Sequence, residues 1–183
     1  MPTSTAPATY RKRLARWNRA VARARLHLAK VRLGRERRKR ARIVAAARWG
    51  AAHQPQIHYA ETRPIPLQAA GLLPVLPLTT DCSGFVTVCY RAAAAPDPNG
   101  AGYNGQGFTG TLLGNGRKVE KPKPGDVVVY GSGQGHHAAL IVAGGSDPLT
   151  VSHGSEAGPL LIKVSAERHY QPPGTTYLRF PVV

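Results

Sequence analysis

Positive charge is concentrated near the start of this sequence, and the asymmetry divides the chain into two physically different parts. Residues 1–50 contain 16 Lys and Arg residues and one acidic residue, Glu36, which gives a net charge of +15. The whole chain has 25 basic and 9 acidic residues, so residues 51–183 keep 9 basic and 8 acidic residues, a net charge of +1. The sequence therefore predicts a cationic arm over residues 1–40 and a nearly neutral folded domain over residues 41–183.

The length and composition of the chain limit its class. At 183 residues it can form one ordinary domain with an appendage, which excludes a large multidomain enzyme. Hydrophobic residues make up 42% of the chain and charged residues 19%, so a core can form and a wholly disordered protein is excluded. No apolar segment of the signal-peptide kind follows Met1 and no apolar run reaches 18 residues, so we expect neither a signal peptide nor a transmembrane helix.

The arm carries a helical pattern with one apolar seam. Its residues are spaced alternately by four and three, which is the a/d spacing of a heptad: Tyr10, Leu14, Trp17, Val21, Ala24, Leu28 and Val31. Gly34 predicts a break, after which a second helix over about residues 36–49 would turn Ile43, Val44 and Ala47 toward the domain.

Two interpretations of this seam stay open. It can pack on the domain or on a second copy of the chain, with the charges as a solvated face. Alternatively the arm binds anions, namely a membrane interface, an acidic cell-wall polymer or nucleic acid. Nucleic acid is not expected, because the arm has no reader motif and only sequence-independent phosphate binding would be left. The residues predicted to bind the anionic envelope are Arg11, Lys12, Arg13, Trp17, Arg35, Arg37, Arg38, Lys39 and Arg40.

A short buried helix is predicted to carry a cysteine at its start. Residues 51–80 are rich in proline and apolar residues and predict a long ordered insertion, and the segment DCSGFVTVCYR at 81–91 then has a helical apolar pattern. Thr80 or Asp81 is a natural N-cap, which places Cys82 in the first turn, where the helix dipole and free N–H groups favour a thiolate. Cys89 lies seven residues on, about 10 Å along one helix, so both thiols should be free and Cys89 should be a core residue.

The rest of the domain predicts strands, so the fold class is α+β. The expected strands, separated by turn residues, are 126–130, 137–143, 149–153, 160–164 and 176–180, in an antiparallel meander. His137 opens the second of them and His153 ends the third, so both can lie at one end of the sheet, with His153 hydrogen-bonded to His137 and fixing its tautomer. His136 is a rival base, but strand alternation turns only one of the two adjacent histidines toward Cys82.

Four segments together resemble the NlpC-type cell-wall cysteine peptidases, a papain-like family. They are DCSGFV at 81–86, PGDVVVYG at 124–131, HHAALIVAGG at 136–145 and VSHG at 151–154, and the resemblance covers roughly residues 40–183. The runs GFTGTLL at 107–113 and SHGSEAGP at 152–159 are most similar to the versions found in endolysins of phages that infect actinobacteria.

The resemblance implies a papain-like fold, in which the helix bearing the nucleophile packs on an antiparallel sheet, and a thiol mechanism. On matching positions, Cys82 is the nucleophile, His137 the base and His153 the residue that orients the base. Oxyanion or substrate contacts are expected from Tyr59, Asp81 and Ser83. The 22 residues between Tyr59 and Cys82 exceed the usual spacing of the family, so we expect the 60–80 insertion to reshape the cleft.

The implied substrate is the peptidoglycan stem peptide, cut at the γ-D-glutamyl to diaminopimelate bond by a peptidoglycan endopeptidase that needs no metal or cofactor. The implied route is that of an endolysin made in the host cytoplasm and released to the wall. Three alternatives stay open: an N-acetylmuramoyl-L-alanine amidase, a cross-bridge endopeptidase, and a non-catalytic basic module that binds nucleic acid or membrane. A glycine-rich phosphate loop at 131–135 and a zinc site are disfavoured, because the glycines precede a strand and no zinc-binding motif occurs.

Overall fold

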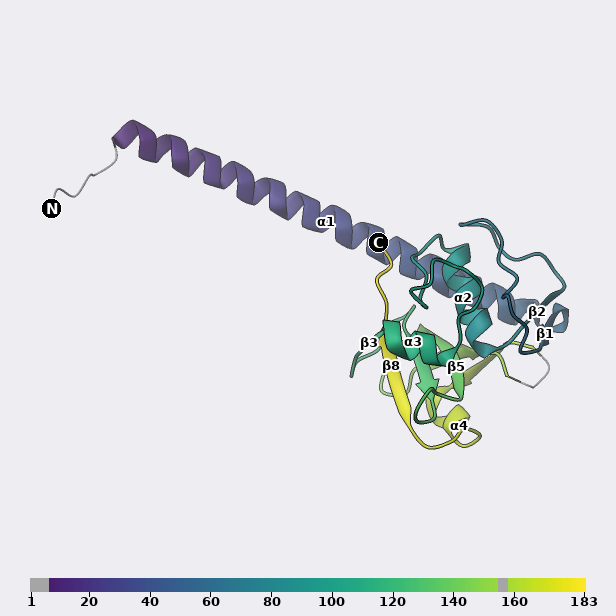
Figure 1. Ribbon diagram of the computed structural model, residues 1–183. Helices are drawn as coiled ribbons and strands as arrows, with labels where there is room; N and C mark the ends of the chain where they lie inside the picture. The colour runs from purple at the N-terminus through teal and green to yellow at the C-terminus, as the bar shows by residue number, and fades with distance from the viewer. Residues whose placement is uncertain (1–6, 155–157) are drawn as a thin grey trace. The chain divides into compact units, whose positions relative to one another are not determined.

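The computed structural model describes residues 7–154 and 158–183, and the chain divides into two compact units, residues 1–37 and 38–183. Figure 1 gives the order of the elements along the chain. Helix α1 (Ala8–Ala52) provides the regular structure of the first unit and also the first element of the second. None of the helices in the described ranges is long and apolar enough to cross a membrane.

Helix α1 runs through Gly34 without interruption, so the predicted break there is wrong. A single glycine in a helix interior costs only about 1 kcal/mol relative to alanine, and the neighbouring residues are mostly Arg, Lys, Leu and Ala, the strongest helix formers. The favourable propensity of the flanking turns outweighs the cost of one glycine.

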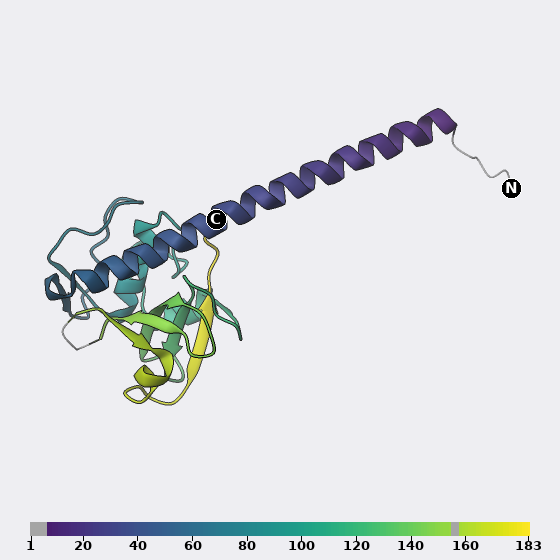
Figure 2. The same ribbon diagram turned by 180° about the vertical axis from the view of Figure 1, so that it is seen from behind.

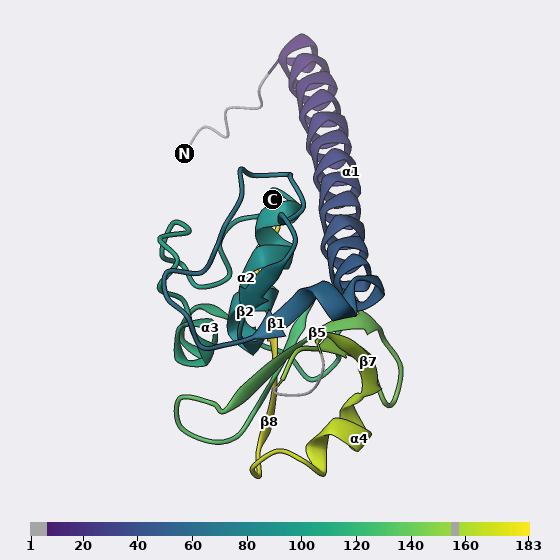
Figure 3. The same cartoon turned by 90° about the vertical axis from the view of Figure 1, so that its right-hand side faces the viewer.

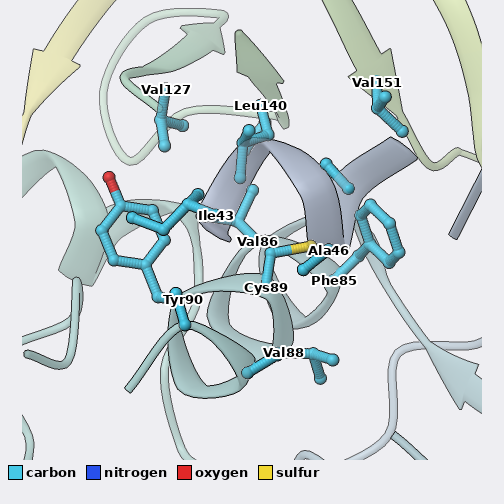
Figure 4. Packing of buried hydrophobic residues seen from close by; sticks show 14 of the residues in the cluster. Ile43, Ala46, Phe85, Val86, Val88, Cys89, Tyr90, Val127, Leu140 and Val151 are labelled. Atoms are coloured by element: carbon cyan, nitrogen blue, oxygen red, sulfur yellow. The ribbon is translucent and has the colours of Figure 1, made fainter. Parts of the chain in front are cut away.

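The last turns of α1 belong to the core of the second unit. Ile43 and Ala47 are fully buried, and Figure 4 shows Ile43 among the side chains of Val86 and Tyr90. The predicted packing of this segment on the domain is thus confirmed for Ile43 and Ala47, while Val44 is half-buried against the same core.

Two cations assigned to envelope binding are instead structural. Arg40 is buried and its Nη1 donates to Oδ1 of the fully buried Asp126 at 2.7 Å. Arg179 pairs with the other side of the same carboxylate, with Nη2 at 2.6 Å from Oδ2. The Nζ of Lys39 donates to the carbonyl of Ala93 at 3.1 Å and to that of Ala94. Because burying a charge is costly unless it is paired, these contacts commit Lys39 and Arg40 to the fold.

An antiparallel sheet forms the centre of the second unit. Its six strands lie in the order β3 (Arg117–Lys118), β8 (Thr175–Arg179), β4 (Val127–Tyr130), β5 (His137–Ala143), β6 (Leu149–Ser152) and β7 (Leu160–Lys163). The five expected strands are confirmed, and strands β4 to β7 form the expected meander. The last strand, β8, returns to pair with β4, and β3 pairs with β8 at that edge of the sheet.

The two faces of the sheet are covered by different helices. Helix α2 (Cys82–Ala92) packs on the face that carries Val127 and Leu140, as Figure 4 shows. Val128 and Tyr130 lie in a second cluster with Val164 of α4 (Val164–Arg168), because successive strand residues point to opposite faces. The views in Figure 2 and Figure 3 show α2 and α4 on either side of the sheet. The fold is therefore α+β, with a helix packed on an antiparallel sheet.

The insertion after α1 is an ordered loop between two short strands. A 3-10 turn (Gln54–Gln56) leads into β1 (Ile57–Tyr59), which pairs in parallel with β2 (Leu78–Thr80). A further helix, α3 (Thr109–Asn115), follows α2. The periodicity of the sequence did not predict β1, β2, α3, α4 or β3, which are all too short to show a repeating apolar pattern.

Candidate active site

Cys82 is the first residue of α2, as the sequence predicts. Asp81 is the N-cap, with extended backbone, and its Oδ1 accepts hydrogen bonds from the N–H of Gly84 at 2.6 Å and the hydroxyl of Ser83 at 3.0 Å. This cap satisfies one of the free N–H groups of the first turn and fixes the start of the helix. The backbone N–H of Cys82 has no acceptor within the helix, so it is available to a developing oxyanion.

The parallel pair of strands β1 and β2 directly precedes the start of α2. Tyr59 of β1 is in register with Thr80 of β2, two residues before Cys82. The pairing brings Tyr59 into the cavity that Cys82 lines, despite the long insertion between them. Tyr59 is therefore placed where an oxyanion or substrate contact is possible, and that role stays a prediction.

His137 lines the same cavity as Cys82 and carries a strongly perturbed pKa. Burial alone would lower that pKa, but hydrogen bonds to the side chains of Cys82 and Glu167, together with their negative charge, outweigh it and raise the pKa of His137 to about 10. The Nε2 atom is occupied by Ser152 and Glu167, which leaves Nδ1 for the thiol. A protonated imidazole beside the sulfur is the state in which a cysteine acts as a thiolate nucleophile.

The residues that hold His137 in place are Ser152 and Glu167, not His153. His137 Nε2 lies 2.7 Å from Ser152 Oγ and 3.2 Å from Glu167 Oε1, and the Ser152 hydroxyl donates to the same carboxylate oxygen at 2.8 Å. Glu167 lies on α4 and is only 5% exposed. The side chain that contacts the predicted base is thus a buried carboxylate from a helix that the strand pattern did not reveal.

Strand alternation explains why His153 is displaced from the predicted position. Ser152 is in register with Ala139 of β5, so it shares a sheet face with Ala139 and His137. His153 follows Ser152 and points to the other face, where its ring packs against Phe85 and Tyr59 at centroid distances of 5.6 and 5.5 Å. Its Nε2 lies 2.9 Å from the carbonyl of Thr80. The predicted hydrogen bond from His153 to His137 is replaced by one that holds the backbone before Cys82.

His136 and Cys89, the second histidine and the second cysteine near the site, lie away from the Cys82 thiol. His136 is exposed and its Nδ1 lies 3.2 Å from Gln171 Oε1, so it contacts the rim of the cavity and not the thiol. Cys89 is fully buried in the core, and burial raises the pKa of its thiol above the ordinary value. Both cysteines are free thiols. Among residues 7–154 and 158–183, no cluster of His, Cys, Asp and Glu is arranged to hold a metal ion.

The site opens into a cleft of about 1000 Å³. Cys82, His137 and Glu167 lie in its wall, and the 60–80 insertion adds Glu61 and Arg63. Four apolar or aromatic side chains also line the cleft, namely Phe108, Leu160, Ile162 and Tyr170. A cavity of this size is large enough for an extended peptide-like substrate.

Arg63 connects the insertion to the start of α2. Its Nη2 donates to Asp81 Oδ2 at 2.8 Å and to Ser83 Oγ at 3.1 Å, and its Nη1 donates to the carbonyl of Thr62 at 2.7 Å. Asp81 and Ser83 are therefore engaged in a network that anchors both residues beside Cys82, and substrate contact by them stays a prediction. The insertion is consequently part of the cleft wall.

Comparisons with known proteins find similarity only among solved structures. No protein-family model and no curated protein matches the sequence. Six chains of solved structures match, and one of them is a "NlpC/P60 family protein" from Bacillus cereus ATCC 10987, with 19% sequence identity and a TM-score of 0.42. The match covers 58% of this chain and 33% of that chain, so this chain spans about a third of the length of that protein.

Sequence reasoning missed Glu167, Ser152 and Arg63. Glu167 lies in the five-residue helix α4, too short for a periodic signal, and Arg63 lies in an aperiodic loop. Ser152 could have been found, because the predicted register of two neighbouring strands decides which of two adjacent residues shares the face of His137. The sequence predicted that Cys82 and His137 lie together, while the group that contacts His137 from its other side depended on how the strands and α4 come together.

Proposed function

We propose that this chain is a cysteine peptidase of peptidoglycan, which cuts the γ-D-glutamyl to diaminopimelate bond of stem peptides by thiolate acyl transfer. The observation that supports the reaction type is the group of three buried side chains in the wall of a large cleft, which are Cys82, His137 and Glu167. The substrate class is supported by the motifs around Cys82 and His137, which resemble those of NlpC-type peptidases.

The geometry supports a two-step reaction. The Cys82 thiolate attacks the scissile carbonyl carbon, and the C–N bond breaks as the His137 imidazolium gives its proton to the leaving amine. Water then attacks the thioester with His137 as base, which releases the carboxylic acid and restores the thiol. The Cys82 backbone N–H stabilises the oxyanion in both steps. Glu167 and Ser152 keep the ring oriented and stabilise its charge.

In this proposal the arm concentrates the enzyme on an anionic envelope. Residues 1–37 carry 11 basic residues and the single acid Glu36, a net charge of +10, with the enzyme made in a host cytoplasm and acting on the wall after release. Attraction between exposed charges acts over about 8 to 10 Å at physiological ionic strength, so this contribution falls as salt is added.

The test is digestion of purified diaminopimelate-type peptidoglycan with mass spectrometry of the soluble fragments. The intact protein should release disaccharide-dipeptides and expose new diaminopimelate amino termini, whereas Cys82→Ser should release nothing. Cys89→Ala is the matched control, since it removes the core thiol and should keep the activity.

Each other outcome has a distinct meaning. Intact stem peptides freed from glycan would identify an N-acetylmuramoyl-L-alanine amidase, and cut cross-bridges would identify a cross-bridge endopeptidase. Equal behaviour of the wild type and Cys82→Ser on diaminopimelate, lysine and amidated walls would refute the enzyme and favour a basic binding module.

A further inference from the structure

We infer that the arm, residues 8–35, is an interfacial helix whose apolar seam inserts into an anionic lipid surface. The inference rests on the envelope role proposed above for the arm and names its partner as lipid. It does not depend on the reaction at Cys82.

The apolar seam is exposed along the helix. Among its members Tyr10, Trp17 and Leu28 are 58%, 67% and 66% exposed, and Leu14 and Val31 are also exposed. Over residues 7–37, the described part of this unit, α1 is the one regular element, so no second helix or strand of that part covers the seam. A row of large apolar side chains, with one Trp and one Tyr, is the apolar face that an interfacial helix buries at the boundary between headgroups and acyl chains.

The opposite face of the helix carries a row of cations, beside several alanines and the leucines Leu26 and Leu33. Lys12, Arg16, Arg19, Arg23 and Lys30 each follow a seam residue by two positions, which turns them about 200° around the helix from it. Further cations lie at the edges of the seam, where long side chains can bury their stems and keep the charge at the headgroup level.

The charges next to the seam argue against a second copy of the chain as the occupant. If the seam were the a/d core of a homodimer, the flanking e and g positions would include Arg11, Arg13, Arg25 and Arg32. Coiled coils often pair opposite charges at these positions, whereas two copies of this arm would bring only basic and neutral residues together there. An anionic surface turns the same residues into favourable contacts.

A soluble polyanion accounts for only half of the pattern. Such a polymer neutralises the cations but gives the seam nothing to bury, so Tyr10, Trp17 and Leu28 would stay in water. A lipid surface is the partner that satisfies both faces at once.

The test uses the full chain and vesicles of phosphatidylcholine with and without phosphatidylglycerol. The seam variant is Leu14→Gln with Leu28→Gln. The matched control is Leu26→Gln with Leu33→Gln, because these leucines are also exposed on α1 but lie outside the seam. Both variants make the same change in charge, composition and helix propensity, and they differ only in the face that is altered.

We expect the seam variant to lower partitioning onto anionic vesicles at least about tenfold, since removing two inserted leucines forfeits more than the 1.4 kcal/mol that corresponds to a factor of ten. The control should stay within about twofold. Tryptophan emission should shift to the blue on anionic vesicles, and Trp17→Phe should abolish the shift. Vesicles without phosphatidylglycerol should bind weakly.

Three results would overturn the inference. Equal losses in the seam variant and the control would mean that the face does not matter. Binding to soluble polyglutamate as tight as binding to vesicles, unaffected by the seam variant, would mean charge-only attraction. A sedimentation change from dimer to monomer in the seam variant would make a second copy the occupant. Cleavage of soluble muropeptides, measured in parallel, should be unchanged in the seam variant, so failure of lipid binding is distinguishable from failure of the enzyme.

Discussion

Replacing Glu167 by glutamine should weaken the proposed enzyme by removing the charge that stabilises the His137 imidazolium. The carboxylate contacts His137 Nε2 at 3.2 Å and is buried, so solvent screens the pair only weakly. A hydrogen bond to a charged group contributes about 1.5 to 3 kcal/mol, and about 1.4 kcal/mol corresponds to one pKa unit and to a factor of ten in rate. We therefore expect kcat/KM to fall about 10- to 100-fold in Glu167→Gln.

The same substitution should also change the pH dependence of kcat/KM in a definite direction. The active state is the thiolate with a protonated imidazole, so activity is lost on the alkaline side as pH rises through the pKa of His137, which is raised to about 10. Without the carboxylate that pKa should fall by about 1 to 2 units. The alkaline limb of kcat/KM should move to lower pH by the same amount.

The assay is the pH dependence of kcat/KM on a soluble muropeptide. Glu61→Gln is the matched control, because Glu61 lines the same cleft but belongs to the insertion and not to α4. The pH profile of this variant should stay that of the wild type. Thermal unfolding of both variants checks that the isosteric change leaves the fold intact. An unmoved alkaline limb in a folded, weakened Glu167→Gln variant would refute the orienting and charge-stabilising role.

Two further predictions test the start of α2. Gly84→Ala should lower the melting temperature and abolish most activity, because a Cβ there would overlap the Thr80 hydroxyl and press on the N-cap carboxylate. The control is Gly114→Ala on α3, where a Cβ would meet open space. This variant should have a slightly higher melting temperature and keep the activity. Brief treatment of the folded protein with iodoacetamide should modify Cys82, which lines the cleft, and spare the fully buried Cys89, and peptide mapping showing equal labelling would contradict this assignment.

The sequence determined the features that depend on local patterns. Cys82 at a helix start follows from the N-cap and the apolar run after it, and the five strands follow from apolar segments separated by turn residues. The order of helix before sheet, together with His137 at a strand start, was enough to predict that thiol and imidazole meet. The break predicted at Gly34 is wrong, because the strong helix formers on both sides of this glycine outweigh its cost.

Only the tertiary structure decided which side chains surround His137. A shift of one residue between Ser152 and His153 reverses the face of the sheet, and the register of β5 with β6 is a contact between segments far apart in the chain. Glu167 reaches His137 because α4 covers the face of the sheet that carries His137. Arg40, predicted to be part of the arm, belongs to the folded domain because it pairs with the buried Asp126. These outcomes depend on desolvation and pairing across the folded core, and a local sequence pattern contains no information about either.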